Sequence, residues 1–348
     1  MNRGRVYTET LGARDVAEGE ALLDLLTRRY AHSSRDVWAE HVREGRVSLD
    51  GRTVTDPGAP VFAGVALTYA RPAWREPDAP LELWALHADA DLLILHKPSG
   101  LPTLPSEMYF EHTVLRLLAR ARPAGEGDPP AVPIHRLGVG TSGALVCSSR
   151  AAVRAQLGRA LEAREVRKVY RALLSGHVDA DAFDVDVPIG PVPHASWGGS
   201  VAGAVPAGGR GAKRALSHVA VLRRLAATAD RGPTTLVEVT IPTGRPHQIR
   251  IHMAYAGHPL EGDPLYAAGG LPRAAPAEVG GGRPPLPRDV GYLLHAARVT
   301  LSHPSSGERL EVAAPPPAAL SVEGELTHEQ WCEQNAPRRL DLAPLACN

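Results

Sequence analysis

The sequence predicts an α+β fold with a large mixed or antiparallel sheet, preceded by a smaller domain. Short apolar or alternating runs bounded by Gly, Pro or Asp recur along the chain, and such runs are typical of strands. Segments with apolar residues at helical intervals are fewer and lie between these runs. The 348 residues, 44% of them hydrophobic, supply enough core material for one large domain and one small domain.

The N-terminal segment predicts two helices followed by a β-hairpin. Residues 1–15 are polar and predict an irregular lead-in. Apolar side chains in residues 20–30 and 35–44 follow helical spacing. Asp50-Gly51 lies within an alternating stretch, which is a strong hairpin signal, and residues 65–69 predict a further strand.

A Pro-rich linker at residues 71–80 precedes the part of the chain that predicts the large sheet. The expected strands are short apolar runs, at 81–86, 92–97, 144–147, 169–174, 183–189, 216–222, 236–241, 292–301 and 309–312. The expected helices are at 113–122, 151–167 and 249–256, with a short one after 323 that leads into a loose tail. Gly, Ala and Pro predict a mobile loop at 193–211 and disorder at 267–291.

The charge pattern excludes a global attraction to nucleic acid, because the formal net charge is +0. Binding to RNA would therefore depend on local clusters of the 38 basic residues, of which only Lys97, Lys168 and Lys213 are lysines. The three cysteines are widely spaced, so neither a zinc site nor a disulfide framework is expected. No apolar run reaches membrane-spanning length, and the sequence predicts a cytoplasmic protein without a membrane partner.

Three motifs stand out from this background. Residues 133–147 read PIHRLGVGTSGALVC, in which glycines flank small hydroxyl residues and permit close approach of another chain before a buried strand. Residues 96–102 read HKPSGLP, and residues 243–252 read TGRPHQIRIH, followed by GHPLEGDPLY at 257–266. The first of these alone is equally compatible with an ordinary Gly-rich turn, but the three together are more specific.

With these motifs the chain resembles the RluA family of RNA pseudouridine synthases over about residues 19–315. The resemblance implies a catalytic domain of pseudouridine synthase type at 80–320, an S4-like α/β RNA-binding domain at 1–75 and a C-terminal tail at 321–348. It implies an isomerase that converts specific uridines to pseudouridine in structured RNA, either rRNA or tRNA. RNA is then the expected partner, and a monomer without metal or cofactor is expected.

The resemblance also implies roles for individual residues. Tyr170 matches the active-site tyrosine of the family, and Arg250 matches the arginine that pairs with the catalytic Asp. The residues expected to contact RNA lie in the motifs and on the first two helices: Lys97, Arg136, Thr141, Ser142, Arg245, His247, Gln248, Arg28, Arg29 and Arg35. Alternatives for three groups are a structural ion pair at Arg136, a core position for Tyr170 and a salt-bridged surface for the N-terminal arginines.

One residue departs from the family motif. The family has His-Arg-Leu-Asp with an essential carboxylate, and here Gly138 stands at that position. A glycine can neither attack carbon nor accept a proton, so three explanations stay open: a silent RNA-binding relative, a substitute carboxylate such as Asp89, Asp91 or Asp263, or a subgroup with a different route. Arg250 is expected to lack its protein partner. An enzyme of free nucleosides is a further, less favoured alternative.

Overall fold

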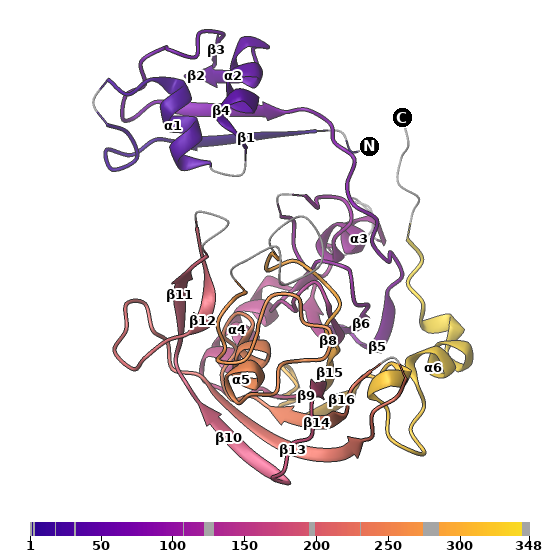
Figure 1. Cartoon of the computed structure of the whole chain (residues 1–348). Coiled ribbons are helices and arrows are strands. Elements are labelled where there is room, and N and C mark those ends of the chain that lie inside the picture. Colours follow the sequence, from indigo (N-terminus) through magenta and orange to yellow (C-terminus); the bar gives the residue numbers. More distant parts are fainter. Residues whose placement is uncertain are drawn as a thin grey trace. The chain divides into compact units, whose positions relative to one another are not determined.

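The computed structural model describes the chain except residues 1, 3, 18, 31, 32, 107, 122–128, 195–198, 230, 274–284 and 343–348. The described chain forms two compact units (Figure 1). The N-terminal unit contains residues up to 77 together with 106–111. The larger unit, which we call the catalytic unit after the resemblance described above, contains 78–105 and 112–345. Each unit has its own hydrophobic core, and we describe each by itself.

The N-terminal unit is a four-stranded antiparallel sheet in the order β1-β4-β2-β3, packed against two helices. Its elements are β1 (Arg5–Thr10), α1 (Leu22–Arg29), α2 (Arg35–Arg43), β2 (Val47–Leu49), β3 (Arg52–Val54) and β4 (Ala66–Arg71). Leu22, Leu25 and Leu26 of α1 are buried with Trp38 and Val42 of α2, as their helical spacing predicts. The irregular lead-in was a wrong prediction, because its polar residues pair with β4 as an edge strand.

The catalytic unit is built on a ten-stranded mixed sheet in the order β10-β13-β14-β9-β15-β8-β6-β5, with β16 beside β15 and β7 beside β8. The strands of this sheet are β5 (Trp84–Ala88), β6 (Leu93–Lys97), β7 (Val132–Pro133), β8 (Thr141–Ser148), β9 (Arg167–Ser175), β10 (Ala182–Asp186), β13 (Leu216–Leu225), β14 (Thr234–Thr240), β15 (Leu294–Ser302) and β16 (Arg309–Ala313). The α+β class and the large mixed sheet are confirmed.

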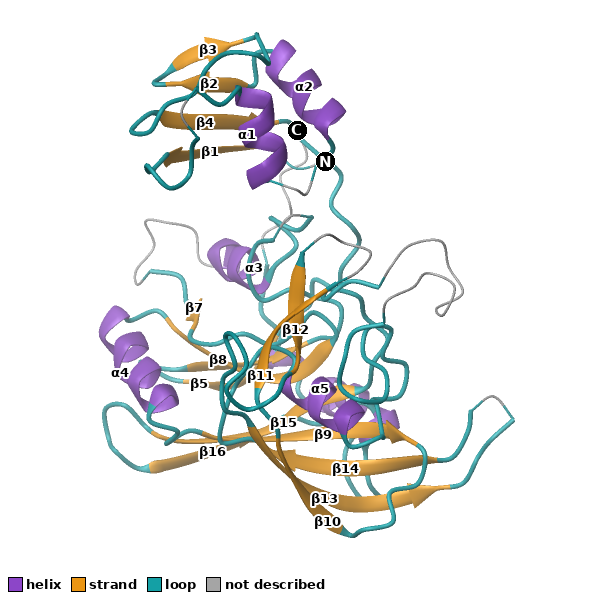
Figure 2. Cartoon of the chain, turned by 60° about the vertical axis from the view of Figure 1, so that its left-hand side comes forward, coloured by secondary structure: helices purple, strands orange, loops and turns teal. Residues whose placement is uncertain are grey.

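Two helices cover opposite faces of this sheet near β8 (Figure 2). Residues of α4 (Ala151–Glu162) share a buried cluster with Ala144 and Val146. Residues of α5 (Gln248–Tyr255) share the other cluster with Leu145 and Cys147. The alternation of β8 between the two clusters explains why its residues 144–147 are all apolar and why the whole strand is buried, as the sequence predicts for a buried strand.

Three further segments differ from their prediction. The mobile loop expected at 193–211 contains β12 (Ser200–Ala204), which pairs with β11 (Ile189–Pro193), while residues 195–198 lie outside the described residues. The middle of the segment expected to be disordered, 274–284, also lies outside them. The short helix expected after 323 is present as α6 (His328–Gln334). The tail expected to be loose after it packs beside the start of β5, where the Leu340 amide donates to the Leu83 carbonyl at 2.9 Å. Within the described residues, the remaining α-helix is α3 (Val114–Ala121), and two short 3₁₀ helices lie at Ala318–Leu320 and Ala336–Arg338.

Candidate active site

The HKPSGLP motif holds the loop that leads into β8. The Lys97 ammonium donates to the carbonyls of Pro98, Leu101 and Val139 at 2.8, 2.6 and 3.2 Å. Ser99 Oγ donates to the Gly140 carbonyl at 2.8 Å. Lys97 is fully buried, so its predicted contact with RNA is wrong, and its three N–H groups fix the two motifs to each other.

The start of β8 is fastened to β15. Ser142 Oγ lies 2.8 Å from His295 Nδ1, and His295 Nε2 lies 3.1 Å from the Ala314 carbonyl. Thr141 Oγ1 lies 3.4 Å from the hydroxyl of Tyr292. Both hydroxyl residues are buried, and the predicted RNA contact of Ser142 is wrong because its hydroxyl is engaged inside the unit.

Burial lowers the pKa of His295 to about 4, whereas an unfolded histidine has a pKa near 6.5. Between these values the folded state binds fewer protons than the unfolded state, so the free energy of unfolding is expected to fall as pH drops from about 7 to about 4. Urea unfolding at a series of pH values measures this slope. His295→Gln is expected to flatten it by up to about 1.4 kcal/mol per pH unit, and an unchanged slope in that variant would contradict the assignment.

The third motif forms the turn before α5. His247 adopts the left-handed conformation with φ of 55°, and its Nδ1 lies 2.8 Å from Tyr266 Oη. Gln248 Oε1 accepts from Thr243 Oγ1 and from the Arg245 amide, and its Nε2 donates to the Leu216 carbonyl. Gln248 is buried, so its predicted contact with RNA is wrong and its role is to shape the turn.

Arg250 and Asp263 form a buried bidentate ion pair. Arg250 Nε donates to Asp263 Oδ2 and Arg250 NH2 donates to Oδ1, both at 2.7 Å, and the two side chains are 2% and 1% exposed. Asp263 Oδ1 also accepts from the amides of Leu265 and Tyr266. The expectation that Arg250 lacks a partner is therefore wrong, since a carboxylate from the segment after α5 supplies it.

Two glycines bring Tyr292 to this ion pair. A Cβ at Gly262 would lie 2.3 Å from the Gly291 carbonyl oxygen, so the backbones that precede Asp263 and Tyr292 touch. The Arg250 guanidinium lies over the ring of Tyr292, 4.1 Å from its centroid. The raised pKa of Arg250, which its burial alone would lower, comes from the hydrogen bond to Asp263 and from the neighbouring tyrosine.

Asp89 and Asp91 are not available as substitutes for a carboxylate at position 138. They precede β6, and Leu93 of β6 pairs with Cys147 near the far end of β8. Asp89 accepts from its neighbouring amides and from His87, and Asp91 pairs with Arg150. Both carboxylates therefore lie at the end of the sheet where β8 finishes, whereas Gly138 precedes the start of β8.

Cationic side chains lie in or near the motifs at residues 133–147 and 243–252. Arg136 is exposed. Burial lowers the pKa of His247 to about 3, and the charges of Arg250 and, to a smaller extent, Arg136 contribute. Lys168 Nζ would lie 3.2 Å from a Cβ at Gly244. Burial lowers the pKa of His135 to about 4, and the charge of Lys168 lowers it further. Arg245 Nε donates to the Arg214 carbonyl at 3.0 Å.

Tyr170 lies on the same face of β9 as Lys168, because the two residues are two positions apart on one strand. Its side chain belongs to the buried cluster that also contains Leu137 and Tyr292. Burial raises the pKa of Tyr170 to about 12, so its hydroxyl stays protonated at neutral pH. The Tyr170 side chain is 8% exposed, which agrees with the core alternative, and its predicted role in stacking on a base stays a prediction.

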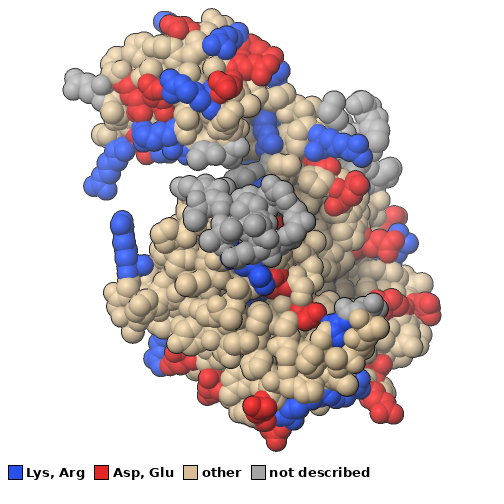
Figure 3. Space-filling model, viewed as in Figure 1, with Lys and Arg blue, Asp and Glu red and all other residues tan. Residues whose placement is uncertain are grey.

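The three N-terminal arginines predicted to contact RNA are paired with acidic residues. Arg28 pairs with Glu20, Arg29 with Glu9 and Asp15, and Arg35 with Asp24, at N···O distances from 2.5 to 2.8 Å. Figure 3 shows acidic and basic side chains interspersed on this unit. This arrangement agrees with the alternative prediction, in which the N-terminal arginines form a salt-bridged surface.

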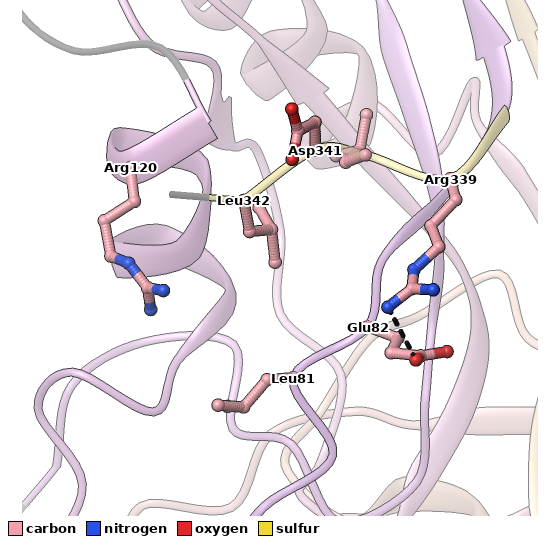
Figure 4. A pocket seen from close by; sticks show the side chains of 7 residues that line it. Leu81, Glu82, Arg120, Arg339, Asp341 and Leu342 are labelled. Atoms are coloured by element: carbon pink, nitrogen blue, oxygen red, sulfur yellow. Dashed lines mark ion pairs between the residues drawn. The ribbon is translucent and has the colours of Figure 1, made fainter. Parts of the chain in front are cut away.

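A surface pocket of the catalytic unit lies apart from the motifs in sequence. Its lining residues are Leu81, Glu82, Arg120, Arg339, Leu340, Asp341 and Leu342. Figure 4 shows Arg339 reaching Glu82, at 2.8 Å. None of these residues belongs to the three motifs, so the pocket is separate from the candidate active site in composition.

A mixed sheet that carries these motif loops is typical of RNA pseudouridine synthases. A family model described as RNA pseudouridylate synthase matches residues 91–255. A solved structure, human RNA pseudouridylate synthase domain containing 1, shares the fold with a TM-score of 0.52, at 24% identity and over 71% of this chain and 89% of its own. Within the described residues, no helix is long and apolar enough to cross a membrane.

The chain belongs to this family, within its RluA branch, and is accordingly an isomerase. It is 36% identical to RNA pseudouridine synthase 5 of Oryza sativa, over 93% of this chain and 90% of that protein. It is 38% identical to an uncharacterized RNA pseudouridine synthase of Synechocystis, over 86% and 95%. It is 30% identical to ribosomal large subunit pseudouridine synthase D of Vibrio parahaemolyticus, over 95% and 98%.

Proposed function

We propose that the chain isomerises specific uridines in structured RNA with Gly138 in place of the motif carboxylate. The observation that carries this proposal is the intact interior of the site, in which Arg250 keeps a bidentate anionic partner, Asp263. A buried arginine without a partner would be strongly destabilising, and this arrangement avoids that penalty. Large-subunit rRNA is the first substrate to test, because relatives such as the Vibrio enzyme are named for the large ribosomal subunit.

We further propose roles for Arg136, Lys168 and Tyr170. Arg136 and Lys168 bind RNA phosphates around the target, and the Tyr170 ring stacks on the target base after it leaves its own stack. The N-terminal unit is an S4-like RNA-binding domain, and the domain limits at 75 and 80 stay predictions. A cytoplasmic location, a monomeric state and independence of cofactors also stay predictions.

Release of tritium from 5-tritiated uridine in transcribed rRNA and tRNA tests the activity, because the C5 hydrogen must leave when C5 takes the place of N1. We expect release from one RNA class at one position, with the position found by mapping pseudouridine in the product. The competing function is a silent RNA-binding relative. Folded protein that binds these RNAs without releasing tritium would establish that alternative and reject ours.

Loss of Arg136 or Arg245 is expected to weaken RNA binding and to reduce its salt dependence. Each phosphate contact releases counterions, so removal of one contact lowers the slope of log K against log salt by about 1. The measurement is RNA affinity for Arg136→Ala and Arg245→Ala across a range of salt concentrations. Arg309→Ala, at the exposed end of β16, is the matched control, and slopes equal to the control in both variants would exclude the surface around Arg136 and Arg245 as the RNA site.

A further inference from the structure

Positions 138 and 140 lack the space for a side chain. The backbone conformation at these positions, by contrast, does not require glycine. Neither has φ in the positive range that favours glycine. A Cβ at Gly138 would lie 2.8 Å from Tyr292 Oη, and a Cβ at Gly140 would lie 2.8 Å from Cε1 and Cζ of the same ring. Such distances do not occur in well-packed proteins, so the loop before β8 is shaped around Tyr292.

The Tyr292 ring is fixed while its hydroxyl is weakly engaged. The residue is 4% exposed, and the Arg250 guanidinium covers one part of the ring at 4.1 Å. The hydroxyl partner among the described residues is Thr141 Oγ1 at 3.4 Å, which is long for an O–H···O hydrogen bond. Buried tyrosine hydroxyls usually have a well-formed partner, so this one has capacity left for a ligand.

The hydroxyl lies where the motif of the family has a side chain. Apart from Thr141 Oγ1 at 3.3 Å, it is the atom that a Cβ at Gly138 would meet. Gly138 is exposed, as is Arg136 two positions earlier, so the hydroxyl lies next to a part of the loop that belongs to the surface. A polar atom at this point is placed to contact a nucleotide held by that surface.

We propose that Tyr292 is a catalytic residue, whose hydroxyl takes the place of a side chain at position 138 and hydrogen-bonds to the target uridine. This inference rests on the proposed function. The reaction is an isomerisation in which the C1′–N1 bond breaks, the C1′–C5 bond forms, C5 loses a proton and N1 gains one. No electrons are exchanged with another molecule, and Tyr292 forms no covalent bond.

Tyr292→Phe removes the hydroxyl alone and is the direct test. We expect kcat for tritium release to fall about 100-fold, as for the loss of one preorganised donor, while RNA affinity stays within about 2-fold. Tyr255→Phe, a half-exposed tyrosine at the end of α5, is the matched control and is expected to keep full activity. If the wild type is active and Tyr292→Phe keeps more than about a third of the wild-type kcat, the inference is wrong and the proposed function still holds. Inactive wild type overturns both.

A second pair of variants tests the packing, with the melting temperature as the main measurement. Gly138→Asp alone places its Cβ against the Tyr292 hydroxyl, so it is expected to lower the melting temperature and to give no gain in activity. In Gly138→Asp with Tyr292→Phe the obstructing atom is gone, and the melting temperature is expected to recover toward that of Tyr292→Phe. Additive losses in the double variant would show that the hydroxyl does not fill this volume, and the inference fails.

Discussion

Replacement of Asp263 by Ala is expected to lower the free energy of unfolding of the catalytic unit by about 3–5 kcal/mol. Its carboxylate accepts both arms of the Arg250 guanidinium, and both side chains are almost fully buried. Without the carboxylate an uncompensated charge stays in a dry interior, and two backbone amides lose their acceptor. At about 2–4 °C per kcal/mol the melting temperature should drop by roughly 10 °C, which calorimetry measures directly.

Two further variants distinguish the stability that depends on the buried ion pair from the general effect of losing a carboxylate. Asp184 pairs with His218 on the exposed surface, so Asp184→Ala is expected to cost at most about 1 kcal/mol. Combining Asp263→Ala with Arg250→Met removes both charges and should recover part of the stability lost in the single variant. A single Asp263 variant that melts with the wild type would mean that the pair contributes little.

The sequence was sufficient to predict the helices and strands whose hydrophobic pattern lies within one segment of the chain. The apolar alternation of the strands and the helical spacing in α1, α2 and α4 predict elements that the structure contains within a few residues. β1 and β12 were missed because they are edge strands or hairpin arms made of polar and small residues, which no pattern of burial marks. Their formation depends on partners far along the chain.

The candidate site was predictable at the level of motifs and less so at the level of contacts. Arg250 was recognised from its motif, but its pairing with Asp263 depends on the close approach of Gly262 to Gly291, which are 29 positions apart in sequence. Tyr292 was missed for the same reason, since it precedes β15 and meets the β8 loop only in three dimensions. The sequence signal that could have found it is Gly140, a second glycine two positions after Gly138, because closely spaced glycines are typical of a loop that another part of the chain approaches closely.

Lys97 shows the opposite error. A lysine in an Arg-rich chain suggested a contact that needs a compact ammonium, and the structure agrees with the need but places the acceptors inside the protein. Three backbone carbonyls converge on one Nζ, which the planar guanidinium of Arg would not fit. Sequence patterns alone do not distinguish a phosphate from a carbonyl as the acceptor.

Gly143→Ala is expected to be the most damaging small substitution in the motif. Gly143 has φ of 107°, and an added Cβ would lie 2.3 Å from the Ala296 carbonyl oxygen and 2.7 Å from its amide nitrogen. These are backbone atoms of β15, so relief requires β8 and β15 to separate at the point where they pair. Strain and overpacking together are expected to cost about 4 kcal/mol, and the Ser142–His295 contact and the loop above it should be lost with the pairing.

The matched control is Gly158→Ala in α4, where a Cβ meets no atom within 4 Å. Alanine is favoured over glycine inside a helix, so this variant is expected to gain about 1 kcal/mol. Thermal unfolding and tritium release are measured on both. Since β8 carries the motif loop into the sheet, Gly143→Ala should lose activity together with stability, whereas Gly158→Ala should keep it. Equal melting temperatures for the two variants would refute the close backbone approach that fixes the motif loop beside Tyr292.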